Sequence, residues 1–383
     1  MNLTAQLDKL SSFGPVPYPV ISLYLNAQPG QTGRDQFRTF IRKEFAARSR
    51  TYPANSPDRE SLDRDVDRIL RYLETELQPS ANGIAIFACS AGELFEPIQL
   101  AAPIDQHWLY ISDQPHLYPL ARINSRYPRY AAVLADTNSA RILVIATGEV
   151  VSRRDVTGIK TKRTSQGGWS QARFQRHTEN FHLQHAKEVI EALDAIVRHE
   201  GLEQIIVMGD EVITPLLREQ MPKHLAEKVV DHVRLDSGAP VDDVLKATLE
   251  AMKKVNERTD REKVEAAVGA YRAGGLGAVG PENTLEALIR GQVEELLVAA
   301  SVRGMRRVRS SSPLADAEEA GLAEPAVDTT AAGEAAESDP QAVRLADELI
   351  TKAQQTAARI TFIEEPSLLE KHGGVAALLR FRA

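Results

Sequence analysis

The stretch from Ala131 to Leu235 constrains the fold more than any other part of the chain, because short apolar runs alternate in it with long helical patterns. Ala131–Ala135 and Arg141–Ala146 flank a turn-like Asp-Thr-Asn-Ser, which is typical of a β-hairpin. Two further apolar runs, Ile205–Met208 and Lys228–Leu235, each follow a helical pattern. The order strand, strand, helix, strand, helix, strand predicts a mixed α/β sheet with a long loop projecting from one edge.

That loop is the most basic part of an otherwise acidic chain. Five cations and no carboxylate lie between Ile159 and Arg176, and they are Lys160, Lys162, Arg163, Arg173 and Arg176. The same loop contains Gly167-Gly168-Trp169-Ser170-Gln171. Two glycines let a backbone approach a ligand closely, and a glutamine offers one acceptor and two donors without a charge. The pattern favours contact with a polyanion whose reactive centre is reached by backbone and amide groups. The alternative is a solvated, flexible connection.

A long helix is predicted directly after the loop. Ser170 is suited to cap its start, and Gly201 to end it after about Glu200. His182 and His185 lie three residues apart on this helix and could share a face toward a metal ion. Because no third ligand follows in a known metal pattern, we favour histidines at the edge of the core or facing RNA, and we expect no metal site.

Two other groups of polar residues are weaker candidates. Asp136 and Asp210 follow predicted strands and could be catalytic carboxylates, but Asp136 lies in a turn where capping of the backbone is the ordinary role. Arg34, Arg38 and Arg42 share a helix face that could touch RNA, although a solvated face is the commoner outcome.

Two α/β regions flank the central one. Residues 1–127 combine predicted strands with two helices, and residues 271–383 begin near a glycine-rich break and end in Gly-Gly-Val-Ala-Ala-Leu-Leu-Arg-Phe. Within the latter, 310–340 is rich in small and acidic residues and poor in large apolar ones, which predicts a disordered insertion. We therefore predict three small α/β domains in series, namely 1–127, 128–270 and 271–383.

Composition limits the classes of function. The 383 residues carry a net charge of −7, which argues against indiscriminate nucleic-acid binding. Cys89 is the only cysteine, so disulfides are excluded and a cysteine zinc site is disfavoured. The N-terminus does not read as a signal peptide and no apolar run is long enough to span a membrane. We expect a cytoplasmic monomer without a cofactor.

Three tracts together resemble one known superfamily. The central tract joins AAVLADTNSARILVI, the GGWSQ loop and the helix QARFQRHTENFHLQHAKEVIEAL, while the last region adds TLEALIRGQVEELLVAA and GGVAALLRF. Their order and spacing resemble the archaeal–eukaryotic peptide-chain release factor and Pelota superfamily. Within it, the chain resembles more closely the bacterial branch and the related peptidyl-tRNA hydrolases of ribosome quality control. The resemblance implies that the last domain has a fold similar to ribosomal proteins that bind kink-turn RNA.

The resemblance also implies roles for the loop residues. The loop would reach the peptidyl-transferase centre of the ribosome, with Gln171 beside the terminal adenosine of peptidyl-tRNA. Because a neutral amide is a poor base, Gln171 would position water, and its backbone N–H would stabilise the developing charge. Gly167 and Gly168 would allow the approach, and Trp169 would stack on a base. The five cations of the loop would contact phosphates.

The chain departs from the release factors at the loop itself. Those proteins use Gly-Gly-Gln, whereas here Trp169 and Ser170 separate the glycines from Gln171. Gly168 and Gln171 instead match the Gly-x-x-Gln spacing of the quality-control branch. The chain also lacks an Asn-Ile-Lys-Ser tract, which eukaryotic factors use in stop-codon recognition.

These features predict a ribosome-associated peptidyl-tRNA hydrolase, or a release-factor-like rescue protein, that acts without reading a stop codon. Two alternatives stay open. One is a non-catalytic, Pelota-like binder of the ribosomal A site in hibernation or stress, for which a translation GTPase is a candidate partner. The other is an endonuclease that cuts tRNA near its 3′ end.

Overall fold

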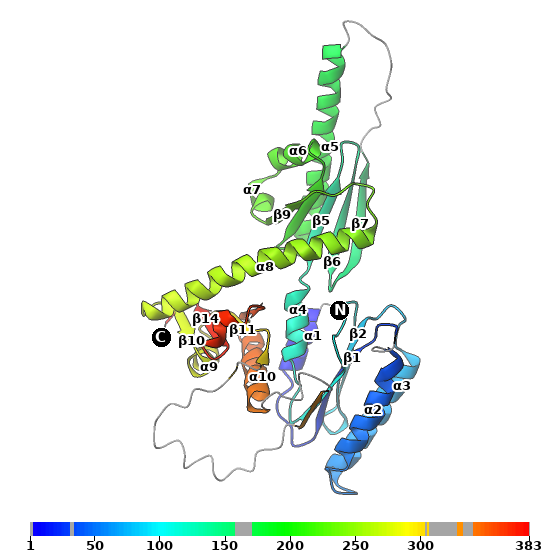
Figure 1. Ribbon diagram of the computed structural model, residues 1–383, viewed down its shortest axis with the longest axis vertical. Helices are drawn as coiled ribbons and strands as arrows, with labels where there is room; N and C mark the ends of the chain where they lie inside the picture. The colour runs from blue at the N-terminus through cyan, green and yellow to red at the C-terminus, as the bar shows by residue number, and fades with distance from the viewer. Residues whose placement is uncertain are drawn as a thin grey trace. The chain divides into compact units, whose positions relative to one another are not determined.

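A computed structural model describes residues 3–30, 34–157, 171–302, 305, 328–331 and 340–382, and for 34–36, 171–178 and 328–331 the backbone alone (Figure 1). Two compact units make up the chain. One unit combines Met1–Arg126 with Asp260–Ala383, and the other is Tyr127–Thr259. The predicted mixed α/β class is confirmed, whereas the division into three domains stays a prediction.

A five-stranded mixed sheet forms the centre of the unit Tyr127–Thr259, with the strand order β7-β6-β5-β8-β9. Strand β5 pairs antiparallel with β6 and parallel with β8, so the direction of the sheet changes at β5. The predicted hairpin is confirmed, and β7 extends it as an edge strand. The strands are β5 (Tyr130–Ala135), β6 (Ser139–Ala146), β7 (Glu149–Thr157), β8 (Ile205–Gly209) and β9 (Val229–Val233).

Helices cover both faces of this sheet. On one face, α5 and α6 pack through residues such as Val189, Leu193 and Leu217 against alternate strand residues. The first half of α8 packs on the other face through Val244 and Met252. Alternate strand side chains point to opposite faces, so the central strands β5 and β8 are buried along their whole length. The helices are α5 (Gln171–Glu200), α6 (Ile213–Gln220), α7 (Lys223–Ala226) and α8 (Val241–Arg272).

In the other unit, an antiparallel sheet has the order β12-β4-β1-β2-β3, in which β12 is Asp328–Ala331. Helices α2 and α3 cover one face of it through Phe37, Ile41 and Ile69. Ser56 caps α3, where its Oγ accepts the N–H of Arg59 at 3.2 Å. The elements are α1 (Leu3–Ser11), β1 (Val20–Asn26), α2 (Arg34–Ser49), α3 (Pro57–Thr75), β2 (Gly83–Cys89), η1 (Ser90–Gly92), β3 (Leu94–Leu100), β4 (Trp108–Ser112) and α4 (Tyr118–Arg126).

A second sheet in the same unit has the order β10-β14-β11-β13, in which β11 and β13 are parallel. The last turns of α8 cover one face through Val264 and Ala267, and α9 and α10 lie on the other. The elements are β10 (Gly277–Val279), α9 (Pro281–Ile289), β11 (Val293–Ala299), α10 (Pro340–Gln355), β13 (Arg359–Ile363), α11 (Ser367–Glu370) and β14 (Val375–Leu379).

One hydrophobic core joins these two sheets. Leu7 of α1 and Leu120 of α4 share a buried cluster with Ala346 and Leu349 of α10. Polar contacts run through the same region, because the Tyr118 hydroxyl donates to the Ala299 carbonyl at 2.6 Å. The first and last predicted domains therefore pack as a single unit, a result that local sequence patterns did not indicate.

Part of the predicted disordered insertion is ordered. Residues 328–331 form strand β12, which pairs antiparallel with β4 and covers its edge. The remainder of 310–340, apart from Pro340, lies outside the described residues. We also expected residues 127–130 to form a linker, but Tyr130 belongs to β5 and is only 1% exposed. In the described part of the chain, we find no helix that combines the length and apolarity needed to cross a bilayer.

A buried carboxylate on α10 ties the two sheets together. Asp347 is 6% exposed and accepts the backbone N–H of Leu117 at 3.0 Å and of Tyr118 at 3.1 Å. Its second oxygen lies against the ring Nδ1 of His116, which is 3% exposed. One side chain thus satisfies three buried polar groups more than 200 residues away in the sequence, including N–H groups at the start of α4.

We expect Asp347→Ala to reduce the free energy of unfolding by about 3–5 kcal/mol, because three buried polar groups lose their partner. Urea denaturation of the full chain measures this change. The neighbouring, half-buried carboxylate provides a control, and Glu348→Ala should cost much less. An equal loss in both variants would contradict this role of Asp347.

Asp260, on α8, should make stability depend on pH. It is 4% exposed, and burial raises its pKa to about 6, with further contributions from the charges of Glu364 and Glu295. The unfolded chain ionises first as pH rises, so stability should fall between about pH 4 and pH 6, by at most about 3 kcal/mol. Asp260→Asn should remove this fall in denaturation measured across pH. Glu262→Gln, at an exposed position, should leave it unchanged.

Candidate RNA-contacting loop and its support

The predicted site residues divide between the loop and the start of α5. Six of them lie in 158–170, outside the described residues, and they are Lys160, Lys162, Arg163, Gly167, Gly168 and Trp169. Gln171 is the first residue of α5, and Arg173 and Arg176 lie in its first two turns, where the backbone is helical. The roles assigned to these residues stay predictions.

Helix α5 is a long arm attached to the sheet at one end. Its 30 residues span about 45 Å. Figure 1 shows the N-terminal turns extending past the end of β7, while the later turns lie on the sheet. The helix begins immediately after Ser170, the predicted cap, which lies outside the described residues. It ends as predicted, because Gly201 has φ of +62° and Leu202 donates its N–H to Val197 at 3.0 Å.

The later turns of α5 are fixed by packing and by ion pairs. Val189 and Leu193 are 0% exposed against the sheet. Asp194 accepts Nε2 of His224 at 2.7 Å and Nε of Arg198 at 3.0 Å, and the hydrogen bond from His224 contributes most to holding the pKa of Asp194 below its ordinary value. The sheet therefore fixes the direction in which the arm projects.

The carboxylate of Asp136 caps the turn between β5 and β6, as we predicted. Its Oδ1 accepts the N–H of Asn138 at 2.6 Å and of Ser139 at 2.8 Å. Asp210, after β8, caps the start of α6 in the same way, accepting the N–H groups of Val212 and Ile213 at 2.9 Å each. Both carboxylates are engaged with the backbone, which favours the structural role over the catalytic one.

The histidines of α5 do not form a metal site with other described residues. His182 is half-buried, and both ring nitrogens of the buried His185 lack a hydrogen-bond partner within the described ranges. Among the residues with described side chains, no group of three or more His, Cys, Asp or Glu could hold a metal ion. On α2, Arg38 and Arg42 are exposed, and the side chain of Arg34 lies outside the described set.

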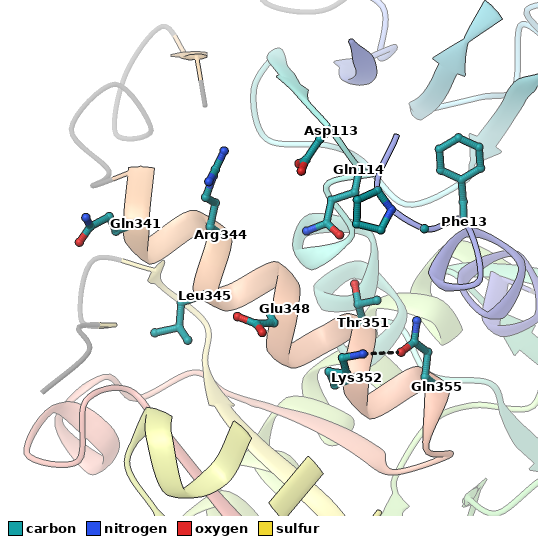
Figure 2. A pocket seen from close by; sticks show the side chains of 12 residues that line it. Phe13, Asp113, Gln114, Gln341, Arg344, Leu345, Glu348, Thr351, Lys352 and Gln355 are labelled. Carbon is teal, nitrogen blue, oxygen red and sulfur yellow. Dashed lines mark hydrogen bonds between the residues drawn. The ribbon is translucent and has the colours of Figure 1, made fainter. Parts of the chain in front are cut away.

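A cavity of about 430 Å³ lies in the unit that contains α10 (Figure 2). Its lining mixes the cations Arg344 and Lys352 with the carboxylates Asp113 and Glu348, so it selects neither anions nor cations by net charge. Lys352 Nζ donates to Gln355 Oε1 at 3.1 Å on one wall. The cavity therefore adds nothing to the basic character of the candidate site.

One hydrogen-bond network in the sheet that supports the loop was not predicted from the sequence. Ser237 Oγ donates to Asp136 Oδ2, and Arg141 Nη2 donates to the carbonyls of Ser237 and Ala239 at 2.6 Å each. These partners are about 100 residues apart along the chain, and only the return of the chain after β9 brings them together. No local motif signals such a network.

A family of known proteins matches the central region of the chain. Residues 115–253 match the family described as bacterial archaeo-eukaryotic release factor family 10. This match contains the whole sheet from β5 to β9, the loop and α5. No curated protein is significantly similar to this chain.

Several solved structures are similar over much of the chain. The archaeal translation termination factor aRF1 is 17% identical, with 99% of this chain and 97% of that chain covered and a TM-score of 0.26. Dom34 of S. cerevisiae, a translation termination-like factor of RNA quality control that interacts with Hbs1, is 12% identical, with 78% and 80% covered and a TM-score of 0.41. An archaeal Pelota, described as ribosome-bound together with ABCE1, is 15% identical, with 99% and 94% covered and a TM-score of 0.40.

With TM-scores this low, the whole-chain likenesses support no conclusion about this chain, and the assignment depends on the match of the central region. That match contains the central tract of the sequence resemblance, namely the hairpin, the basic loop and the long helix. The predicted resemblance is therefore confirmed for the central region: residues 115–253 of this chain match a family in the bacterial branch of the archaeal–eukaryotic release factor superfamily.

Proposed function

We propose that this protein acts on the ribosome as a peptidyl-tRNA hydrolase that releases nascent chains without reading a stop codon. The observation that carries the proposal is the position of Gln171. It is the first residue of the 30-residue helix α5, directly behind a Gly-Gly loop, within a region that matches a release factor family. An arm of this length would present the glutamine well away from the sheet.

The start of a helix suits the chemistry of ester hydrolysis. The first four N–H groups of an α-helix have no partner within the helix, and the helix dipole places partial positive charge there. The backbone N–H of Gln171 belongs to this set, so it is suited to stabilise an oxyanion. The Gln171 amide would position the attacking water, and the substrate ribose would carry the proton.

The charge of the loop suits a tRNA end. Residues 159–176 include five cations and no carboxylate, and the rest of the chain is acidic overall. Contacts of Lys160, Lys162, Arg163, Arg173 and Arg176 with phosphates would concentrate binding at the tip of the arm and would weaken with added salt. Trp169 would add a stacking contact with a base, worth about 1–3 kcal/mol.

Gln171→Ala should reduce peptide release from stalled ribosome–nascent-chain complexes by about 100-fold or more, because water is no longer positioned for attack. The assay measures the released peptide in single turnover. Gln184→Ala is the matched control, because it makes the same change at an exposed position of the same helix. Equal release by wild type and Gln171→Ala would rule out the proposed mechanism.

The same assay separates the alternatives. Trp169 and Ser170, which widen the spacing between the glycines and Gln171, favour a non-catalytic binder of the A site. Such a binder would sediment with vacant ribosomes, release no peptide, and bind equally well as Gln171→Ala. Mapping the tRNA 3′ end after the reaction distinguishes hydrolysis, which leaves the terminal adenosine intact, from endonucleolytic cleavage. A translation GTPase is the candidate delivery partner for such a binder. Measuring ribosome binding of this protein with and without the GTPase tests that partnership.

A further inference from the structure

The loop that carries the proposed chemistry has two attachment points of different strength. One is α5, which packs on the sheet through residues such as Val189 and Leu193. The other is β7, which ends at Thr157, the residue before 158–170. β7 is an edge strand whose side chains are exposed except for the half-buried Val150 and Val156. Burial of apolar surface therefore does little to fix β7, and its position depends on pairing with β6.

Asp136 forms hydrogen bonds at the end of that pairing. Besides the N–H groups of Asn138 and Ser139, the carboxylate accepts Ser139 Oγ at 3.0 Å and Ser237 Oγ. Burial alone would raise the pKa of Asp136, but the hydrogen bonds from Ser237, Asn138 and Ser139 outweigh it and hold the pKa below its ordinary value. The group is therefore a carboxylate near neutral pH, with acceptors for all four donors.

The first connection to β7 runs through Ser139. Ser139 is the first residue of β6, and its Cα pairs with that of Thr157, the last residue of β7. Asp136 holds Ser139 by both its backbone N–H and its hydroxyl, and the N–H of Asp136 donates to the Ser139 carbonyl at 2.9 Å. The turn that begins β6 is thus fixed at the point where β7 ends.

The second connection runs through Ser237. The Ser237 hydroxyl binds Asp136, while the Ser237 carbonyl accepts Arg141 Nη2 at 2.6 Å. Arg141 in turn pairs in register with Asp155 of β7. Both connections from Asp136 therefore reach the last three residues of β7, just before the chain enters 158–170.

Asp210 is a natural comparison on the same sheet. It follows β8, which pairs with β5 in parallel so that Ala135 lies opposite Gly209. Asp210 Oδ1 accepts two backbone N–H groups at 2.9 Å, as Asp136 does, but these belong to α6. The two aspartates thus share a capping role, and of the two only Asp136 has described hydrogen bonds that lead to β7.

We propose that Asp136 is a positioning residue for peptide release, holding the end of β7 so that the loop leaves the sheet at a fixed place. This inference rests on the proposed function of Gln171. Reaction rates depend steeply on geometry, and a displacement of about 1 Å can cost about 100-fold. A loop attached to one rigid helix and one weakly buried edge strand needs the strand end to be fixed by polar contacts.

Asp136→Asn tests the contribution of the two serine hydroxyls to holding the end of β7. Asparagine can still accept the backbone N–H groups through Oδ1, but it offers no second acceptor to the hydroxyls of Ser139 and Ser237. In the free protein, hydrogen exchange of the amides near Thr157 should become about tenfold faster, and that of β8 should not change. Ser237→Ala, which removes one of the two hydroxyls, should act in the same direction with a smaller effect. If Asp136→Asn fails to fold, Ser237→Ala provides the test in its place.

Release from stalled ribosome–nascent-chain complexes should then be measured as a function of protein concentration. Asp136→Asn should lower the single-turnover rate at saturation by about 10-fold to 100-fold and leave the half-saturating concentration unchanged. Asp210→Asn should leave both parameters at the wild-type values. Asp136→Glu, which restores two acceptors on a longer side chain, should recover part of the rate.

The possible outcomes separate this inference from the proposed function. Release that needs Gln171 but is as fast in Asp136→Asn as in wild type would overturn the positioning role alone. Equal losses in Asp136→Asn and Asp210→Asn would also overturn it, because they would indicate general destabilisation. No release by the wild type, or equal release by Gln171→Ala, would overturn the proposed function and this inference with it.

Discussion

The parallel pairing of β5 with β8 is the constraint on which the central unit depends. Two parallel neighbours need a crossover that returns the chain to the starting end of the sheet, and here the crossover contains β6, β7, the loop and α5. The hairpin must finish where β5 finishes, so the loop leaves from the carboxyl ends of β5 and β8. Helix α5 then runs back along the sheet. Its first turns extend past the end of the sheet and form the projecting arm (Figure 1).

The same end of the sheet also gathers the polar groups that fix the turns. Asp136 and Asp210 follow neighbouring parallel strands, and the segment after β9 brings Ser237 to Asp136. This is the end at which α/β sheets commonly place their functional groups. In this chain the carboxylates accept backbone N–H groups, and we propose the chemistry for residues on the loop and the helix that the sheet supports.

Local patterns predicted the sheets well and the packing poorly. The apolar runs of β5 and β8 were recognised because strands buried on both faces read as nearly continuous hydrophobic stretches. Strand β4 and helices α1 and α4 were missed, since each is short and becomes buried only against α10 or neighbouring strands. Strand β12 consists of Asp, Thr, Thr and Ala, and only the free edge of β4 makes it a strand.

By itself, the sequence determined the order of helices and strands, the basic Gly-Gly-Trp-Ser-Gln loop and the position of Gln171 directly behind it, because periodicity and turn residues act over short distances. Tertiary structure alone decided that the first and last regions share a core around Asp347, and that Asp136, Ser237 and Arg141 meet beside the end of β7. Such contacts join residues about 100 to 230 positions apart. These contacts form because buried polar groups need hydrogen-bond partners, and the fold supplies partners that are distant in the sequence. No local sequence pattern predicts such pairs.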